Sequence, residues 1–156
     1  MKTEKSYSSS ILINNSSENV FDKIGEVTKW WSENIEGNSK NLNDIFSIQF
    51  AFGDSFEIKV IESIPTKKIA WKVLDSNLTW IKNEKEWKGT QLVFEIFHLQ
   101  EQLEIRFTHF GLTPEIECFN GCSKGWNYFI HESLFGFLNE NKGKPDKKIN
   151  KTTKES

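Results

Sequence analysis

The chain has 156 residues, enough for a single domain whose core needs neither a metal ion nor disulfides. Residues 1–139 hold 14 basic against 19 acidic side chains, a charge balance that argues against binding to nucleic acid. The sequence contains no run of about 20 apolar residues and no apolar signal core, so we expect a cytoplasmic protein without a membrane span.

The first part of the chain predicts one strand followed by two short helices. Residues 7–13 alternate in polarity and end in an aliphatic run, which is typical of a strand. Ser16 is a favoured N-cap for a helix, and Gly25 separates this helix from a second helical turn with Trp30 and Trp31. Neighbours on a helix point about 100° apart, so we expect one tryptophan to fill the core and the other to face an opening.

The middle of the chain predicts an antiparallel sheet of about six strands. Residues 32–44 contain a glycine and several asparagines and are predicted to form a loop, as is the polar segment 76–88. Apolar and polar residues alternate in the five further segments that we predict as strands, which are 45–52, 55–64, 68–75, 89–99 and 102–110. Short links join these segments, which favours hairpins and an antiparallel sheet over a parallel nucleotide-binding one.

The longest helical pattern begins near residue 115 and continues to about residue 141. Cys118 and Cys122 lie four residues apart within it, and we interpret them as reduced, buried, small apolar residues. We assign residues 1–143 to one domain. Residues 144–156 are basic and have little to bury, so they are predicted to be a disordered tail.

This order of elements predicts an α+β fold in which a curved antiparallel sheet wraps around the long C-terminal helix. Bulky rings on both surfaces cannot interdigitate perfectly, so we expect an apolar cavity between sheet and helix. Alternatively, each of these rings simply fills the core and lines no cavity. The residues expected to contact a ligand are Trp30, Trp31, Trp71, Phe94, Phe107, His109, Cys122, Trp126 and Phe129.

Several short strings in a fixed order carry a resemblance that spans residues 5–145. They lie at residues 16–21, 30–32, 86–90, 94–96, 107–112, 125–126 and 133–134. Together they resemble the START-like (SRPBCC) superfamily, in the group related to the C-terminal domain of the activator of heat shock protein 90 ATPase. The resemblance implies a helix-grip fold, with a cavity that relatives use for lipids, polyketides, hormones or other apolar molecules. It implies no particular activity, because members of this group are mostly of unassigned function.

His109 is the candidate catalytic residue. It shares the inward phase of its strand, so we expect it near the mouth of the cavity, where a histidine can titrate near neutral pH. A carboxylate such as Asp75 or Glu86 at the rim would complete an acid/base pair. The alternative is a hydrogen-bonded core histidine with unrelated surface acids. Arg106 lies in the outward phase and is expected to pair with Glu95 or a similar acid.

No metal site or cofactor is expected from the sequence. His98 and His131 have no second histidine or cysteine at ligand spacing, and the chain has no glycine-rich phosphate loop. Ser133 is interpreted as a small residue that lets the long helix approach the sheet.

We interpret the chain as a binding or carrier protein for a small hydrophobic molecule, acting as a monomer or weak homodimer. The first alternative is an enzyme of the cyclase, dehydratase or hydrolase kind that uses His109. The second is an interaction module that docks through Trp80 and Trp87, or a cochaperone-like regulator. The cochaperone alternative is the weaker one, because the N-terminal domain that makes the main chaperone contact in eukaryotic activators has no counterpart in these 156 residues.

Overall fold

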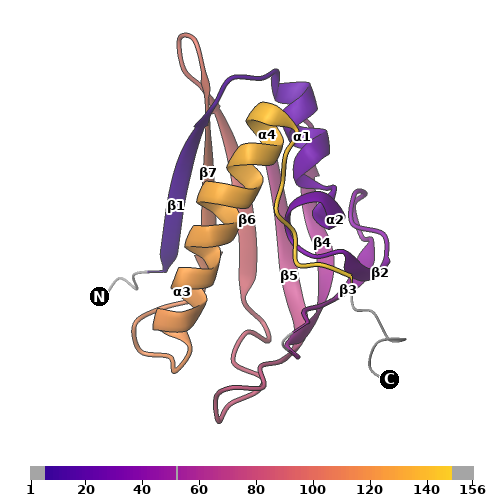
Figure 1. Ribbon diagram of the computed structural model, residues 1–156, viewed down its shortest axis with the longest axis vertical. Helices are drawn as coiled ribbons and strands as arrows, with labels where there is room; N and C mark the ends of the chain where they lie inside the picture. The colour runs from indigo at the N-terminus through magenta and orange to yellow at the C-terminus, as the bar shows by residue number, and fades with distance from the viewer. Residues whose placement is uncertain (1–5, 52, 149–156) are drawn as a thin grey trace.

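The computed structural model describes residues 6–51 and 53–148 of the chain. In this part of the chain, seven strands form one antiparallel sheet that packs against the C-terminal helix (Figure 1). The strands are β1 (Tyr7–Ile13), β2 (Asn34–Gly37), β3 (Ile45–Gln49), β4 (Ser55–Ile64), β5 (Lys68–Asn77), β6 (Gln91–His98) and β7 (Leu103–Phe110). The predicted α+β helix-grip architecture is confirmed.

The strand order is β1-β7-β6-β5-β4-β3-β2, so consecutive strands pair as hairpins from β2 onward. The exception is the step from β1 to β2, which lie at opposite edges of the sheet. Helices α1 (Ser17–Ile24) and α2 (Val27–Trp30) make this crossing, as Figure 1 shows. The predicted cap is present, since the side chain of Ser16 accepts a hydrogen bond from the backbone N–H of Asn19 at 3.1 Å.

Two predictions about the strands need correction. The sheet has seven strands because β2 lies inside the segment 32–44 that was predicted as a loop. β2 has only one aliphatic residue, Ile35, so it shows no alternation, and its backbone pairing with β3 stabilises it instead. The predicted strand 45–52 ends earlier, at Gln49, and its expected last residue, Phe52, lies outside the described residues.

The strands curve around the helix because β4 and β5 pair irregularly at two places. The register shifts between Glu57 and Ile58, and again between Val60 and Glu62. Such bulges bend a strand and increase its local twist. The largest buried rings come from both sides of the core. The strands contribute Phe46, Trp71, Phe94 and Phe107, and the helices with their caps contribute Trp30, Trp31 and Trp126.

The C-terminal helix consists of three segments, α3 (Phe119–Tyr128), the π-helical segment η1 (Phe129–Leu134) and α4 (Phe135–Glu140). It begins four residues later than predicted, because residues 113–118 form turns and the carboxylate of Glu86 accepts hydrogen bonds from the N–H groups of Glu117 and Cys118. It ends as predicted at Asn141, which adopts the left-handed conformation that often terminates helices. The π segment was not predicted.

Residues 144–148 are held against the fold, so the prediction of a disordered tail is wrong for them. Asp146 forms a parallel bridge with Ser32, and its carboxylate accepts a hydrogen bond from the N–H of Ala51 at 2.6 Å. Figure 1 shows this segment passing α2 on its way from α4 to β2. This segment has no apolar pattern that could predict its docking, because polar groups make these contacts. Residues 149–156 lie outside the described residues.

In the part of the chain that the structure describes, no helix combines the length and the apolar character that crossing a membrane requires.

Candidate ligand-binding pocket

An apolar cavity of about 310 Å³ lies at one end of the sheet, between β4, the loop after β5 and helix α3. This volume is at the lower end of the range typical of small-molecule sites. Its lining residues are Trp31, Phe50, Asp54, Phe56, Leu78, Trp80, Trp87, Gly121, Cys122, Gly125, Trp126 and Phe129. Trp80 and Gly121 are exposed, so the cavity reaches the surface at this end.

Aromatic rings that pack on one another build the wall of this pocket. Trp87 is stacked on Phe56, with ring centroids 4.3 Å apart, and on Trp126 at 5.7 Å. Trp31 contacts Trp126 at 5.3 Å and stacks on Trp71, which lies behind the wall, at 5.9 Å. Each ring is therefore held by neighbouring rings, which makes the pocket wall rigid and formed before a ligand arrives.

The structure resolves the different roles of Trp30 and Trp31. The indole N–H of Trp30 donates to the carbonyl oxygen of Ile24 at 3.0 Å, and its ring fills the core next to Phe94. Trp31 is also buried, but its ring forms part of the pocket wall. The adjacent tryptophans thus divide as expected, one in the core and one at the cavity.

Among the described residues of the pocket wall, Asp54 alone has a formal charge, and only 4% of its surface is exposed. It follows Gly53 in the turn between β3 and β4. Oδ1 accepts hydrogen bonds from the backbone N–H of Thr79 at 2.9 Å and from the Thr79 hydroxyl at 3.1 Å. Oδ2 accepts one from the indole N–H of Trp80 at 2.9 Å. Asp54 thereby fixes the loop that covers this end of the pocket.

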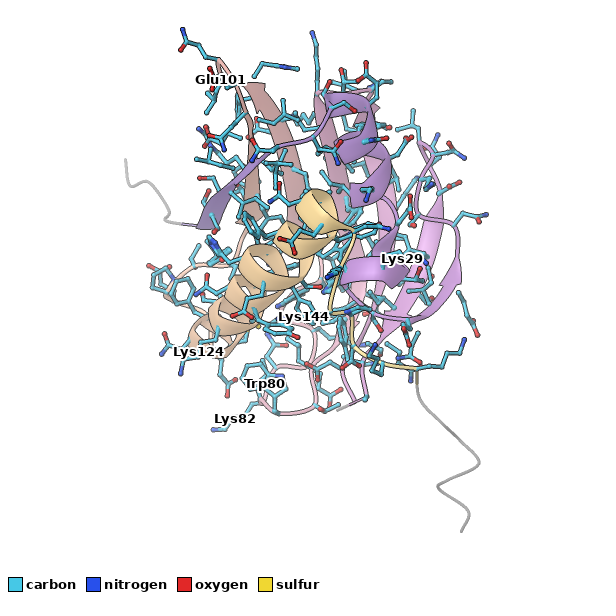
Figure 2. The ribbon with its side chains drawn as sticks, turned by 45° about the horizontal axis from the view of Figure 1, so that its top comes forward. Lys29, Trp80, Lys82, Glu101, Lys124 and Lys144 are labelled. Atoms are coloured by element: carbon cyan, nitrogen blue, oxygen red, sulfur yellow. The ribbon has the colours of Figure 1, made fainter. Side chains whose placement is uncertain are left out.

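Trp80 belongs to the loop that follows β5 and covers the mouth of the pocket. Figure 2 shows this residue near α3. Its ring lies so close to Gly121 that a β-carbon at this glycine would be 2.7 Å from Cη2 of Trp80. Real β-carbons do not come this close to another atom, so a glycine is required for the present position of the ring. About half of the Trp80 surface is exposed, 48%, which leaves its outer face in solvent.

Cys122 contributes a neutral thiol to the wall. Its Sγ accepts a hydrogen bond from the indole N–H of Trp87 at 3.3 Å. A hydrogen bond with Cys118 and burial both raise the pKa of Cys122 far above its usual value. The thiolate is the reactive form of cysteine, so this side chain is a poor nucleophile. Both cysteines are free and buried, as the sequence predicted.

His109 does not lie at the mouth of the pocket, where the sequence placed it. Its strand phase is inward and its ring is fully buried, but Trp87 and Trp126 stand between it and the cavity. Nδ1 accepts a hydrogen bond from Trp126 at 3.0 Å, and Nε2 is 2.9 Å from the hydroxyl of Thr90. Burial lowers the pKa of His109 to about 3. This histidine supports the pocket wall from behind.

The acids that were considered as partners for His109 have other roles. Glu86 accepts the two backbone hydrogen bonds before α3. Asp75 forms an ion pair with Lys85 at 3.1 Å, and the hydrogen bond from that lysine lowers the pKa of Asp75. Neither acid contacts His109, so the expected acid/base pair is absent from the described residues.

Arg106 pairs with an acid on the outer face of the sheet, as expected, but this acid is in its own strand. Glu95 does face it in the neighbouring strand, but the ion pair of Arg106 is with Glu104 at 3.4 Å. The guanidinium also lies over the ring of Phe97, 4.6 Å from its centroid. Both contacts are on the outer face of the sheet, away from the pocket.

Of the nine residues expected to contact a ligand, four line the pocket: Trp31, Cys122, Trp126 and Phe129. The other five lie in the core around it: Trp30, Trp71, Phe94, Phe107 and His109. Six further lining residues were not predicted from the sequence: Phe50, Asp54, Phe56, Leu78, Gly121 and Gly125. Phe56 lies in the inward phase of β4, and Phe50 continues the inward phase of β3 one residue past its end. This alternation was the pattern from which both residues could have been predicted. Trp87 was considered as an exposed docking residue, but only 6% of its surface is exposed.

Among residues 6–51 and 53–148, no three His, Cys, Asp or Glu side chains are grouped so that they could hold a metal ion. His131 lies on the outside of the C-terminal helix and hydrogen-bonds to the hydroxyl of Ser9. Ser133 does more than allow a close approach, since its buried hydroxyl donates to the carbonyl of Trp30 at 2.6 Å and accepts from the N–H of Lys144 at 2.7 Å.

Comparisons with known proteins identify the fold. No protein-family model and no curated protein matches the chain. Among solved structures, the Aha1 dimer from Colwellia psychrerythraea has a TM-score of 0.70 at 24% identity, covering 87% of this chain and 97% of that one. MLL2253 from Mesorhizobium loti has a TM-score of 0.65 at 15% identity, over 85% of this chain and 96% of its own.

A third similar structure is DynU16, a protein of the dynemicin biosynthetic locus, with a TM-score of 0.65 at 14% identity. The match covers 90% of this chain but only 50% of DynU16. At these identities the likeness concerns the fold and not the activity. The chain therefore has the same helix-grip fold as the Aha1 protein from Colwellia psychrerythraea and these other structures.

Proposed function

We propose that the protein binds or carries a small, largely apolar molecule in the cavity between the sheet and α3. The observation that supports this proposal most directly is a space of about 310 Å³ surrounded by seven aromatic rings and a single charged side chain. The pocket is open to solvent, and apolar surface that is left in contact with water is unfavourable. An apolar ligand would gain about 25 cal/mol for each Å² of such surface removed from water.

Binding is favoured over catalysis by the chemistry of the wall. His109 has both ring nitrogens in hydrogen bonds and lies behind two tryptophans. The thiol of Cys122 is held in its neutral form, and the carboxylate of Asp54 already fixes a loop. An enzyme of the cyclase kind would need a proton donor or acceptor in contact with the substrate. The wall offers Asp54 alone for that role.

Tryptophan fluorescence can test the proposal, because Trp31, Trp80, Trp87 and Trp126 line the pocket. A panel of small neutral aromatic compounds, with naphthalene and indole as first members, should include ligands that quench or shift this emission in a saturable way. Native mass spectrometry should give a stoichiometry of one. If no compound in a broad hydrophobic panel binds, the proposal is wrong.

A substitution that fills the pocket provides the matched comparison. A β-carbon at Gly125 would meet no atom within 4 Å, so Gly125→Leu should place its side chain in open space that includes the cavity. We expect this variant to fold and to lose binding. Lys124→Leu is the control, because Lys124 is exposed on the same helix and does not line the pocket.

The oligomeric state stays a prediction. The Colwellia protein was solved as a dimer, which supports the expectation of a monomer or weak homodimer for this chain. Sedimentation velocity over a wide range of protein concentration would distinguish the two states.

A further inference from the structure

The carboxylate of Asp54 is buried in the pocket wall with neutral hydrogen-bond donors only. Its three donors are the N–H and hydroxyl of Thr79 and the indole N–H of Trp80. Oδ2 accepts just one of these bonds, whereas a carboxylate oxygen has two lone pairs. Asp54 therefore keeps the capacity to accept a further hydrogen bond in the pocket that it lines.

No basic side chain of the described residues neutralises Asp54. The five ion pairs of this part of the chain involve other acids. Lys82, in the loop after β5, and Lys124, on α3, belong to the elements that frame the mouth, and neither lines the pocket. Figure 2 shows both lysines extending away from the body of the molecule. Ionised acids are rarely buried without a paired cation, so this site lacks its expected partner.

The rest of the wall also favours positive charge. Seven aromatic rings line the pocket, four of them indoles. The face of an aromatic ring carries partial negative charge, and the indole attracts cations most strongly. Cages of this composition recognise quaternary ammonium groups in proteins. Residues 1–139 also have more acids than bases, 19 against 14, which favours the approach of a cation.

We propose that the pocket selects an organic cation, an amine or quaternary ammonium with an apolar body, over a neutral or anionic molecule of the same shape. The cationic group lies near Asp54, and the apolar body packs among the rings of Trp31, Trp87 and Trp126. This inference rests on the proposed function and specifies the chemical class of its ligand.

Two probes of nearly identical shape provide the test. Benzyltrimethylammonium and neopentylbenzene differ in one central atom, a positively charged nitrogen in the first and a neutral carbon in the second. Both would be titrated into the protein by tryptophan fluorescence at a fixed, low ionic strength. We expect the cation to bind at least about tenfold more tightly, from cation–π attraction and the charge of Asp54 together. Equal binding of the two probes would overturn the inference and leave the proposed function intact.

Asp54→Asn removes the charge of this side chain, together with the acceptor for the indole N–H of Trp80. It keeps the size of the side chain and an acceptor oxygen for Thr79, and we expect it to reduce the preference for the cation to about threefold or less. Asp22→Asn is the control, with the same change in charge at an exposed position of α1. An unchanged preference in Asp54→Asn would contradict the role of Asp54.

The affinities of the two probes for the unaltered protein test the inference even if Asp54→Asn does not fold. Binding of neither probe, nor of any neutral aromatic compound, would instead refute the proposed function itself. The two failures are therefore distinguishable.

Discussion

Trp126 donates its indole N–H to Nδ1 of His109 across 3.0 Å, and this bond assigns the tautomer of the histidine. With Nδ1 as acceptor, the proton lies on Nε2, which donates to the hydroxyl of Thr90 at 2.9 Å. That hydroxyl in turn donates to the carbonyl of Trp87 at 2.6 Å. A chain of hydrogen bonds thus joins Trp126 and Trp87, two of the four tryptophans of the pocket wall, through a neutral histidine.

The low pKa of His109 predicts a dependence of stability on pH. Burial lowers this pKa from 6.5 to about 3 in the folded protein. Between these two values the unfolded chain binds the additional proton, so the contribution of His109 to stability is lost as the pH falls from 6.5 toward 3. The slope from this residue is at most about 1.4 kcal/mol per pH unit. His109→Gln should therefore lower the unfolding free energy at pH 7 and flatten its decline below pH 6.5.

Urea unfolding at pH 7 and at pH 5 would measure both effects. The exposed His98 provides the control, because His98→Gln should leave the decline as it is in the unaltered protein. If His109→Gln shows the same decline, His109 is not kept neutral by the fold.

Periodicity was sufficient to predict most of the sheet, and the reason is visible in β7. Leu103, Ile105, Phe107 and His109 alternate with other residues, and all four are buried. A pattern of this kind exists because one face of the sheet packs on the helix and the other does not. β2 was missed because backbone pairing at the edge, and not a buried face, stabilises it.

The position of the pocket was harder to predict. The sequence indicates which residues point inward, but not where the rings fail to meet. That place depends on the loop after β5, which puts Leu78, Trp80 and Trp87 over one end of the sheet. This loop follows no period, and a turn residue from a distant strand connection, Asp54, holds it. Contacts between non-periodic segments leave no signature in a single sequence.

The buried indoles of Trp30 and Trp71 predict different costs for the same substitution. Both rings are fully buried, but Trp30 donates to the carbonyl of Ile24, whereas Nε1 of Trp71 has no hydrogen-bond partner among the described residues. Trp→Phe removes similar volume at each site. Only Trp30→Phe breaks a hydrogen bond, so we expect it to be more destabilising than Trp71→Phe by about 1 kcal/mol or more. Chemical denaturation gives the comparison, and the reverse order would contradict it.

Two glycines of α3 that both line the pocket predict opposite results with alanine. Alanine is favoured over glycine inside a helix by about 1 kcal/mol. At Gly125 a β-carbon meets no atom within 4 Å, so Gly125→Ala should gain this stabilisation. At Gly121 the β-carbon would be 2.7 Å from the ring of Trp80, which must move. Gly121→Ala should therefore gain less or lose stability, and it should shift the Trp80 emission to longer wavelength.

Thermal unfolding and fluorescence spectra of the two variants, compared in parallel, would check this prediction. Trp80→Phe in each background removes the emission of Trp80 and identifies its part of the spectrum. Equal gains in stability for both variants would show that the ring of Trp80 does not rest on Gly121.

Two serines of the C-terminal helix form a similar pair. Oγ of Ser133 donates to the carbonyl of Trp30 and accepts from the N–H of Lys144, so it ties this helix to α2 and to the segment 144–148. Oγ of Ser123 is buried with no hydrogen-bond partner among the described residues. Alanine raises helix propensity equally at both positions. Ser133→Ala leaves a carbonyl and an N–H without this partner and should lower the unfolding free energy by about 2 kcal/mol.

Ser123→Ala removes a buried group that makes no bond, and we expect it to be neutral or slightly stabilising. Urea unfolding of both variants measures the difference, and limited trypsin digestion reports on the segment after Gly143. The bond after Lys147 should be cleaved sooner in Ser133→Ala, because the hydrogen bond to the N–H of Lys144 is lost. If the two variants are equally stable and are cleaved at equal rates, the Ser133 hydroxyl does not hold the C-terminal segment in place.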